Sequence, residues 1–292
     1  MADNVGNKDA KTFSENVPFA NNGDFHVKGA SNYDWGMKDR LSRIFNPNSG
    51  KTVMLAFDHG YFMGPTSGLE RLDLLIPQLV DYADCLMGTR GGIRSSVPAS
   101  YNKAIALRAS SGSSILQGDL SHESMVVGID DAIKMNASAM AIQTFIGADG
   151  QKETIEALNK AVNLGSKYSI PTMGVVAVGK EMERTSKFFL LATRMLAEFG
   201  VQIVKTYYCE DFEKVASACP VPLVVAGGKK LPEKDALTMA YKSIQSGAAG
   251  VDMGRNIFQS KHPREMIQVV NKIVHEGYSD KEAYELFENL IN

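Results

Sequence analysis

A single lysine interrupts a run of strand-forming residues, Val201-Gln-Ile-Val-Lys-Thr-Tyr-Tyr208. Lysine is a poor strand residue and is costly to bury while charged, so a buried Lys205 needs a partner, a lowered pKa or a chemical task. One such task is a Schiff base, in which a neutral amine attacks a ketone and the iminium withdraws electrons from the neighbouring C–C bond. The alternative, which this segment alone favours, is a strand-end lysine that pairs with a carboxylate or reaches water.

An Asp-His-Gly turn follows a second strand-forming run, residues 52–57, and supplies two more reactive groups. Asp58 is the leading acid–base candidate, because a carboxylate near a lysine can exchange protons with hydroxyl or carbinolamine oxygens. Asp58 could instead form a salt bridge that keeps Lys205 charged, and the two roles are compatible. His59 is a possible second proton carrier, although many histidines in such short turns only hydrogen-bond the backbone.

Short apolar runs that alternate with longer amphipathic segments would position these groups. Eight runs read as strands: 52–57, 85–88, 104–108, 138–145, 171–176, 201–207, 222–226 and 250–253. Helical patterns fill most gaps, notably near 69–82 and at 151–164, 186–199, 233–246 and 263–276, and each is long enough for a right-handed crossover between parallel strands. Eight such units predict an α/β fold, a single (β/α)8 barrel, rather than an open sheet.

The N-terminal 45 residues are predicted to form a separate arm and helix before a barrel of residues 46–292. Residues 1 to about 32 are polar and glycine-rich, which is typical of an irregular arm. Trp35, Leu41, Ile44 and Phe45 then recur at near-helical spacing, which predicts a short helix. Residues 109–137 are the least regular part of the barrel and predict an elaborated loop over its mouth.

Glycine-rich turns close the last two predicted strands. Such turns leave backbone N–H groups free to converge on an anion, and Arg255 can place two donors on phosphate oxygens. Either turn alone is equally well explained by chain reversal and a surface ion pair. Occurring together after the last two strands of a barrel, they favour a substrate phosphate site of Gly227, Gly228, Gly254 and Arg255.

Other charged residues at the predicted mouth carry no assignment. Arg90, Arg108 and Lys180 could each contact a phosphate or be paired structurally. The adjacent Asp130 and Asp131 would not share a helix face, so a structural role in a first helical turn explains them.

Composition excludes several classes of protein. The formal net charge is -2, so no electrostatic footprint of a nucleic-acid binder is present. No apolar run reaches membrane-spanning length and the N-terminus lacks a signal pattern, so a cytoplasmic protein without membrane partners is expected. Three cysteines without C-x-x-C spacing suggest neither disulfides nor zinc, and the histidines lack metal-ligand spacing, so no metal cofactor is expected.

Taken together, several motifs resemble one family. Phe57-Asp-His-Gly60, the strand-borne Lys205, Ala226-Gly-Gly-Lys229 and Gly250-Val-Asp-Met-Gly-Arg-Asn-Ile-Phe258 are similar to the class I, Schiff-base aldolases of the DeoC/FbaB family, which includes archaeal fructose-bisphosphate aldolases. Asp34-Trp-Gly-Met37, Gly50 to Phe62 and Lys205-Thr-Tyr-Tyr208 resemble its autoinducer-2 thiolase branch more closely.

The resemblance implies roles for the motif residues. Lys205 would be the Schiff-base lysine, Asp58 the acid–base aspartate, and the turns at Gly227–Gly228 and Gly254–Arg255 the phosphate site. It further implies a phosphorylated small-molecule substrate and transfer of an acetyl unit to coenzyme A as co-substrate, giving acetyl-CoA and dihydroxyacetone phosphate. No bound cofactor is implied, and relatives assemble as homo-oligomers, often decamers.

One departure from the family pattern is visible. Family members commonly place a proton-transferring tyrosine at the end of the fourth strand, where this chain has Phe145. Tyr207, Tyr208 or a water could substitute, or the thiolase step could dispense with that hydroxyl. Two other functions stay open: a class I aldolase that cleaves a phosphorylated ketose without coenzyme A, and a non-catalytic protein that binds a phosphorylated signal.

Overall fold

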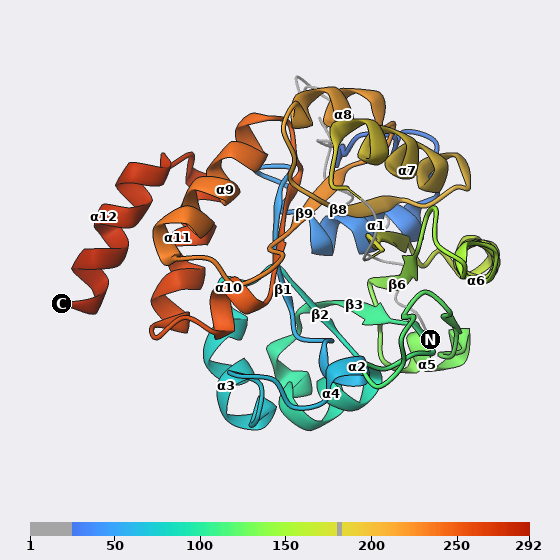
Figure 1. Cartoon of the computed structure of the whole chain (residues 1–292), viewed down its shortest axis with the longest axis horizontal. Helices are drawn as coiled ribbons and strands as arrows, with labels where there is room; N and C mark the ends of the chain where they lie inside the picture. The colour runs from blue at the N-terminus through green and yellow to red at the C-terminus, as the bar shows by residue number, and fades with distance from the viewer. Residues whose placement is uncertain (1–24, 180–182) are drawn as a thin grey trace, which may run out of the picture.

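The structure is a computed structural model that describes residues 25–179 and 183–292 (Figure 1). Most of the predicted N-terminal arm and Lys180 therefore lie outside the described residues. In the described part of the chain, eight parallel strands close into a barrel in the order β1-β10-β9-β8-β7-β6-β3-β2. The strands are β1 Thr52–Ala56, β2 Cys85–Gly88, β3 Ala104–Arg108, β6 Ala139–Thr144, β7 Thr172–Val176, β8 Ile203–Tyr207, β9 Leu223–Ala226 and β10 Gly250–Met253. The predicted (β/α)8 barrel is confirmed, and each predicted strand overlaps one of these.

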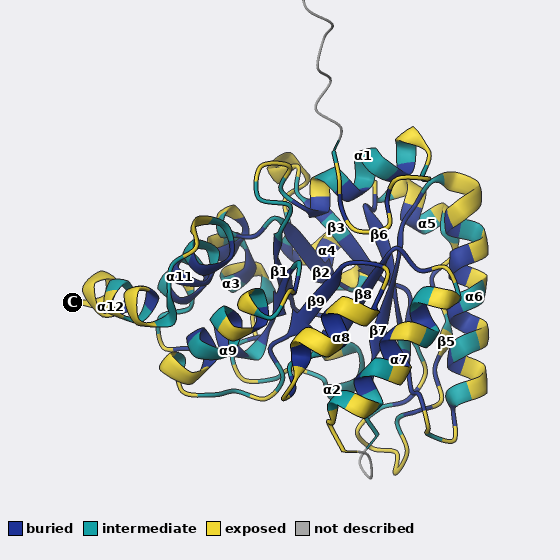
Figure 2. Cartoon of the chain, turned by 90° about the horizontal axis from the view of Figure 1, so that it is seen from above, coloured by how far each residue is buried: buried dark blue, intermediate teal, exposed yellow. Residues whose placement is uncertain are grey.

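Helices connect successive strands and surround the barrel (Figures 1 and 2). Their outer faces are exposed, whereas the central strands are buried. The helices are α1 Trp35–Ile44, α2 Gly60–Met63, α3 Leu72–Leu79, α4 Arg90–Ser96, α5 Ile129–Lys134, α6 Gln151–Tyr168, α7 Ser186–Glu198, α8 Phe212–Ala218, α9 Glu233–Gln245, α10 Arg255–Phe258, α11 Pro263–Glu276 and α12 Asp280–Ile291, with 3-10 turns at Val80–Tyr82 and Ala99–Tyr101.

Local signals explain the ends of the longer helices. Helix α11 begins at Pro263, whose fixed φ suits a first helical position, and ends before Gly277 in the left-handed conformation. Helix α12, which the sequence analysis did not predict, begins with a capping box of Ser279 and Glu282. It packs against α9 and α11 and forms one end of the molecule (Figure 1).

Helix α1 closes the end of the barrel where the strands begin, opposite α2 (Figure 2). Its buried residues Met37, Leu41 and Ile44 share a hydrophobic cluster with barrel-interior residues such as Met54 and Cys85. The predicted short helix is confirmed. The prediction that Trp35 lies on the apolar face of this helix is wrong. Trp35 is 80% exposed at the first helical position, before the first buried residue, Met37.

The irregular segment before β6 is largely a loop at the opposite end of the barrel. Two short antiparallel strands, β4 Ser110–Ser111 and β5 Ser124–Met125, hold its ends together. This pairing brings Glu123, which precedes β5, beside the end of β3.

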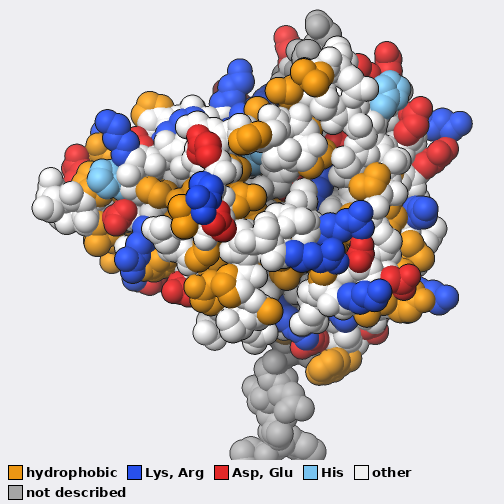
Figure 3. Space-filling model, turned by 90° about the horizontal axis from the view of Figure 1, so that it is seen from below, with side chains coloured by type: hydrophobic (Ala, Val, Ile, Leu, Met, Phe, Trp, Pro, Cys, Tyr) orange, Lys and Arg blue, Asp and Glu red, His pale blue; other side chains and the backbone are white. Residues whose placement is uncertain are grey.

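The charges on the molecular surface are mixed in sign. On the face shown in Figure 3, basic and acidic side chains are intermixed. Among the described residues, no helix is both long enough and apolar enough to cross a membrane.

Candidate active site

A cavity of about 240 Å³ lies at the carboxyl ends of the strands. This is the end of a (β/α)8 barrel at which reactive groups are found. All seven predicted site residues contribute to its lining: Asp58, His59, Lys205, Gly227, Gly228, Gly254 and Arg255. The structure therefore brings together residues from four strand ends that are nearly 200 positions apart in the sequence.

Lys205 points into the barrel, where it meets a carboxylate from a non-adjacent strand. Its Nζ lies 2.7 Å from Oδ2 of Asp252, and the two side chains are 11% and 0% exposed. Nζ also lies 3.3 Å from the Sδ atom of Met87. Both lysine and aspartate occupy positions on β8 and β10 whose side chains alternate toward the interior.

The charges of this pair depend on burial and on each other. Burial by itself lowers the pKa of Lys205, but the carboxylates of Asp252 and Asp58 outweigh it and the pKa is raised. Burial raises the pKa of Asp252, although the neighbouring ammonium opposes it. With Nζ and Oδ2 in ion-pair contact and the pKa of Lys205 raised, Lys205 rests as an ammonium, so a Lys205 nucleophile requires a proton acceptor.

Asp58 is paired with Arg108 rather than with Lys205. Its Oδ2 lies 3.1 Å from Nη1 of Arg108, and both side chains are almost completely buried. The salt bridge that the sequence suggested between Asp58 and Lys205 is therefore replaced by two separate ion pairs, Asp58 with Arg108 and Asp252 with Lys205.

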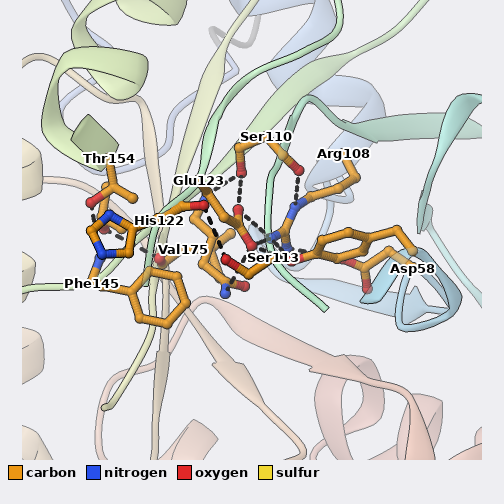
Figure 4. Close-up of polar contacts among 12 residues, drawn as sticks. Asp58, Arg108, Ser110, Ser113, His122, Glu123, Phe145, Thr154 and Val175 are labelled. Atoms are coloured by element: carbon orange, nitrogen blue, oxygen red, sulfur yellow. Dashed lines mark hydrogen bonds and ion pairs between the residues drawn. The ribbon is translucent and has the colours of Figure 1, made fainter. Parts of the chain in front are cut away.

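Arg108 also joins Asp58 to a second buried carboxylate (Figure 4). Its Nη2 donates to Oε2 of Glu123 at 2.9 Å and to the hydroxyl of Tyr61, and its Nε donates to the carbonyl of Ser110. Tyr61 in turn donates to Oε1 of Glu123 at 2.5 Å. The result is a continuous ionic network along one wall of the cavity, and it fixes the orientation of Asp58.

This network sets the protonation of Asp58. Burial raises the pKa of its carboxyl group, but Arg108, followed by His59 and Lys205, outweighs burial and the pKa is lowered. Asp58 is therefore held as a carboxylate and accepts a proton before it can donate one.

His59 lies between the cavity and the aromatic ring of Phe258. The two rings meet edge to face at 5.9 Å, and Nδ1 of His59 has no hydrogen-bond partner among the described residues. Burial and the cations Lys205, Arg255 and Arg108 lower the pKa of His59, against the opposing effect of Asp58. The imidazole is therefore neutral near pH 7 and can exchange a proton.

The two glycine turns contribute to the cavity in different ways. The N–H of Gly227 already donates to the carbonyl of Asp252 at 3.2 Å, so it is not a free donor here, and the place of Gly227 in the phosphate site stays a prediction. Gly228 adopts a left-handed φ of 69° that favours glycine. At Gly254 a Cβ would lie 2.9 Å from Cε1 of His59, so glycine is needed there for close packing.

Arg255 is the cation best placed for an anion in this cavity. Its Nε is buried and has no hydrogen-bond partner among the residues that the structure describes. An unpaired buried guanidinium donor is costly, and a phosphate oxygen is a suitable acceptor for it.

Phe145 occupies the wall at the end of β6, where the family tyrosine was expected. Its side chain is largely buried and lines the Lys205 cavity. Of the two proposed substitutes, Tyr207 lines the cavity, with the guanidinium of Arg184 4.1 Å above its ring. Tyr208 does not line it and packs against Phe212 instead.

Several charged residues named from the sequence lie elsewhere. Arg90 pairs with Asp131 at the surface, and Asp130 and Asp131 occupy the first turn of α5 as predicted.

All three cysteines are free and buried. Within the described residues, no group of three or more His, Cys, Asp or Glu side chains could hold a metal ion.

Three participants were not among the predicted site residues: Asp252, Glu123 and Tyr61. Asp252 was visible at the end of the last predicted strand, and its inward register relative to Lys205 could have marked it. Glu123 lies in the irregular loop and Tyr61 follows the Asp-His-Gly turn, where no periodic pattern indicates the direction of a side chain.

The chain resembles known proteins along most of its length. The family profile described as DeoC/LacD family aldolase matches residues 52–260. A Yersinia enterocolitica protein named 3-hydroxy-5-phosphonooxypentane-2,4-dione thiolase is 52% identical over 288 residues, which is 98% of each chain. A protein of the same name from Enterobacter sp. strain 638 is 52% identical over 99% of this chain and 97% of its own.

Solved structures show the same fold. An archaeal fructose 1,6-bisphosphate aldolase superposes with a TM-score of 0.74 at 23% identity, covering 82% of this chain and 100% of its own. A structure of a Schiff-base-forming fructose-1,6-bisphosphate aldolase gives the same TM-score at 22% identity, with 82% and 99% covered. Since the profile spans most of the chain and the thiolase-named relatives span nearly all of it, this chain belongs to the DeoC/LacD aldolase family.

Proposed function

We propose that this enzyme is a thiolase that cleaves 3-hydroxy-5-phosphonooxypentane-2,4-dione and transfers its acetyl unit to coenzyme A, giving acetyl-CoA and dihydroxyacetone phosphate. The observation that carries the proposal is the buried Lys205 in a cavity that Arg255 also lines, with the Nε of Arg255 lacking a hydrogen-bond partner among the described residues. Relatives that bear this thiolase name are 52% identical over almost the whole chain, which supports the choice of substrate.

The proposed reaction begins when Lys205 forms an imine with the ketone at C4, beside the phosphorylated carbon. The coenzyme A thiolate then attacks the ketone at C2 and the C2–C3 bond breaks. The electron pair of that bond passes into the C3–C4 enamine, with the protonated imine nitrogen as its sink. Protonation at C3 and addition of water to the imine release dihydroxyacetone phosphate, and the acetyl group leaves as the thioester.

The other cavity residues fit roles in this sequence. Arg255, with the Gly228 and Gly254 turns, would hold the phosphate one carbon away from the imine carbon. Asp58, held as a carboxylate, would accept the proton that the thiol loses when it attacks C2. His59 lines the same cavity and its lowered pKa keeps it neutral, so it can take that proton on.

A route for the thiol is suggested by a second cavity of about 370 Å³, which shares Leu120, Phe145 and Val178 with the Lys205 cavity. A third cavity shares Asp58, but the Arg108 network forms the wall on that side. The ring of Phe145 makes no ionic contact, so it can shift without breaking a charged pair. We therefore place the pantetheine arm beside Phe145.

The test is turnover of the phosphorylated diketone with and without coenzyme A, with acetyl-CoA and dihydroxyacetone phosphate followed by mass spectrometry. Both products should appear only with coenzyme A and should be absent with Lys205→Ala. Release of an aldehyde from a sugar phosphate without coenzyme A would instead indicate the plain aldolase. Failure of borohydride to add mass to Lys205 in the presence of a phosphorylated ketone would indicate a binding protein.

The cellular setting is part of the same proposal. We place the enzyme in the cytoplasm, in the processing of the phosphorylated autoinducer-2 signal of quorum sensing, and as a homo-oligomer, with a decamer as the expected size. The 80% exposed Trp35 on α1 is an apolar residue that a subunit contact would cover. Light scattering after size-exclusion chromatography measures the assembly directly.

A further inference from the structure

The chemistry of Lys205 requires a proton acceptor that the proposed function does not specify. An ammonium has no lone pair, so the amine must lose a proton before it can attack a ketone. The carbinolamine must then gain a proton on its hydroxyl group before that group can leave as water. One group that first takes and then returns a proton would serve both steps.

Few groups are close enough to Nζ of Lys205 to do so. Oδ2 of Asp252 lies 2.7 Å away, within the distance over which a proton is transferred directly. Among the described residues, the other polar atom in contact with Nζ is the Sδ atom of Met87, which is a poor base. Asp58 is engaged with Arg108, which stabilises its carboxylate form.

Asp252 is also suited to hold a proton for the duration of a step. The carboxylate is fully buried, and within the described chain neither of its oxygens has a partner in hydrogen-bond geometry, although Oδ2 forms the 2.7 Å ion pair with Lys205. Such a carboxylate is poorly solvated, so the neutral carboxylic acid costs less there than it would in water. By contrast, the ion pair with Arg108 makes the neutral form of Asp58 unfavourable.

We propose that Asp252 is a catalytic residue, the proton carrier of imine formation at Lys205. Asp252 takes one proton from the ammonium, and the neutral amine attacks the ketone to give a carbinolamine with one hydrogen left on nitrogen and one on oxygen. The protonated Asp252 then returns its proton to the hydroxyl group, the C–O bond breaks and water leaves. The products are an iminium on Lys205 and the Asp252 carboxylate, so charge and atoms balance.

This inference rests on the proposed Schiff-base function and adds to it. The competing explanation is that Asp252 is only a counter-ion that keeps Lys205 charged at rest. The two explanations predict opposite changes in the rate of imine formation when Asp252 is removed. Since Asp252 raises the pKa of Lys205, its removal leaves more neutral amine near pH 7 to 9, and a mere counter-ion would then slow imine formation rather than assist it.

Other groups also face the pair and contribute to any pH profile. They are Asp58 and His59 after β1, Cys85 on β2, Arg108 on β3, Tyr207 on β8 and Arg255 on α10. Comparison of variants at each pH, rather than one profile by itself, therefore isolates the contribution of Asp252.

The experiment measures the rate at which cyanoborohydride traps dihydroxyacetone phosphate on Lys205, by intact-protein mass spectrometry, from about pH 6 to above the ordinary lysine pKa of about 10.4. Asp252→Asn keeps the shape of the side chain and removes the proton carrier. Its trapping rate should fall by about 100-fold, the lower range for general acid–base catalysis, and should stay low at high pH because the hydroxyl group still needs a proton.

Asp84→Asn is the matched control, since Asp84 is a half-buried carboxylate at the opposite end of the barrel, where it accepts from the backbone N–H of Val53 at 2.7 Å. Its trapping rate should match wild type. Trapping by Asp252→Asn that equals or exceeds wild type near neutral pH overturns the proposal. If wild type itself is not trapped, the Schiff-base function fails first, and the two failures are distinguishable.

A second variant covers the case in which Asp252→Asn does not fold, as judged by its thermal transition. Asp252→Ala leaves a space in which formate can supply a carboxylate beside Lys205. A trapping rate that rises and saturates with formate supports the proton-carrier role. A rate that does not respond to formate, in a variant that still traps the ketone at high pH, contradicts it.

Discussion

Replacing Arg108 by glutamine removes the guanidinium that lies between two buried carboxylates. The side chains of Arg108, Asp58 and Glu123 are 3%, 7% and 3% exposed, so water cannot solvate the charges that remain. Removal of one partner from a buried ion pair typically costs about 3–5 kcal/mol, and we expect Arg108→Gln to lower the free energy of unfolding by that amount near neutral pH. Arg90→Gln is the control, because its pair with Asp131 is exposed and is worth at most about 1 kcal/mol.

The stability lost in Arg108→Gln should become smaller as the pH falls. The pKa of Asp58 is lowered in the folded protein, so its contribution to stability is present above its unfolded pKa and is lost as the pH falls through the folded pKa. Without Arg108, burial dominates and the folded pKa of Asp58 rises. The gap in stability between wild type and Arg108→Gln should therefore narrow as the pH falls toward about 4, near the ordinary carboxyl pKa.

Urea unfolding followed by circular dichroism, at neutral pH and again near pH 5, measures both effects. The double variant Arg108→Gln, Glu123→Gln should be more stable than Arg108→Gln alone, because it removes one of the unpaired charges. A cost for Arg108→Gln no larger than that of Arg90→Gln, or a gap that does not narrow in acid, would refute the electrostatic account of this network.

Three further predictions test the site and the core. Phe145→Tyr should change the ratio of thiolytic to retro-aldol products, measured by mass spectrometry, because it restores a proton donor in the cavity wall; an unchanged ratio removes this position from reaction choice. Gly254→Ala should reduce turnover of the diketone at least 10-fold and should also lower the free energy of unfolding, because its Cβ would meet a β1 carbonyl oxygen at 2.5 Å and the His59 ring at 2.9 Å. Leu41→Ala should lower the free energy of unfolding by about 2–5 kcal/mol, whereas Arg43→Ala on the same helix should change it by less than about 1 kcal/mol, since Leu41 is buried and Arg43 is exposed in a surface ion pair; equal effects in urea unfolding would contradict the packing of α1.

The barrel could be predicted because its signal is local and repeated. Each strand is a short apolar run, and most of the connecting segments show helical periodicity. The count of eight strand–helix units therefore favours a closed barrel over an open sheet. The same rule places Lys205 and Asp58 at one end of the barrel, because parallel strands bring their carboxyl ends together. Helix α12 was missed because it follows the eighth strand–helix unit, and the repeating barrel pattern predicts no further helix there.

The pairing of charges could not be predicted in the same way. Asp58, Asp252 and Glu123 are three carboxylates near two buried cations, Lys205 and Arg108, and the sequence does not state which pairs form. Which carboxylate pairs with which cation depends on the stagger of the strands around the barrel. It also depends on the short β4–β5 pairing, which brings Glu123 into contact with Arg108. Both are properties of the assembled barrel rather than of any segment.

Depth along the strands explains how one barrel holds both a hydrophobic core and a reactive lysine. On β8 the inward positions run from Ile203, in the apolar cluster that α1 closes, through Lys205 to Tyr207 at the cavity. Lys205 is thus one layer below the mouth, where it is shielded from water but open to substrate. An iminium in that layer is poorly solvated by water, so it withdraws electrons strongly from the neighbouring bond. A lysine two residues later, at the half-buried position of Tyr207, would lie closer to water. The position of Lys205 in the strand, more than the identity of its neighbours in the sequence, therefore makes the proposed chemistry possible.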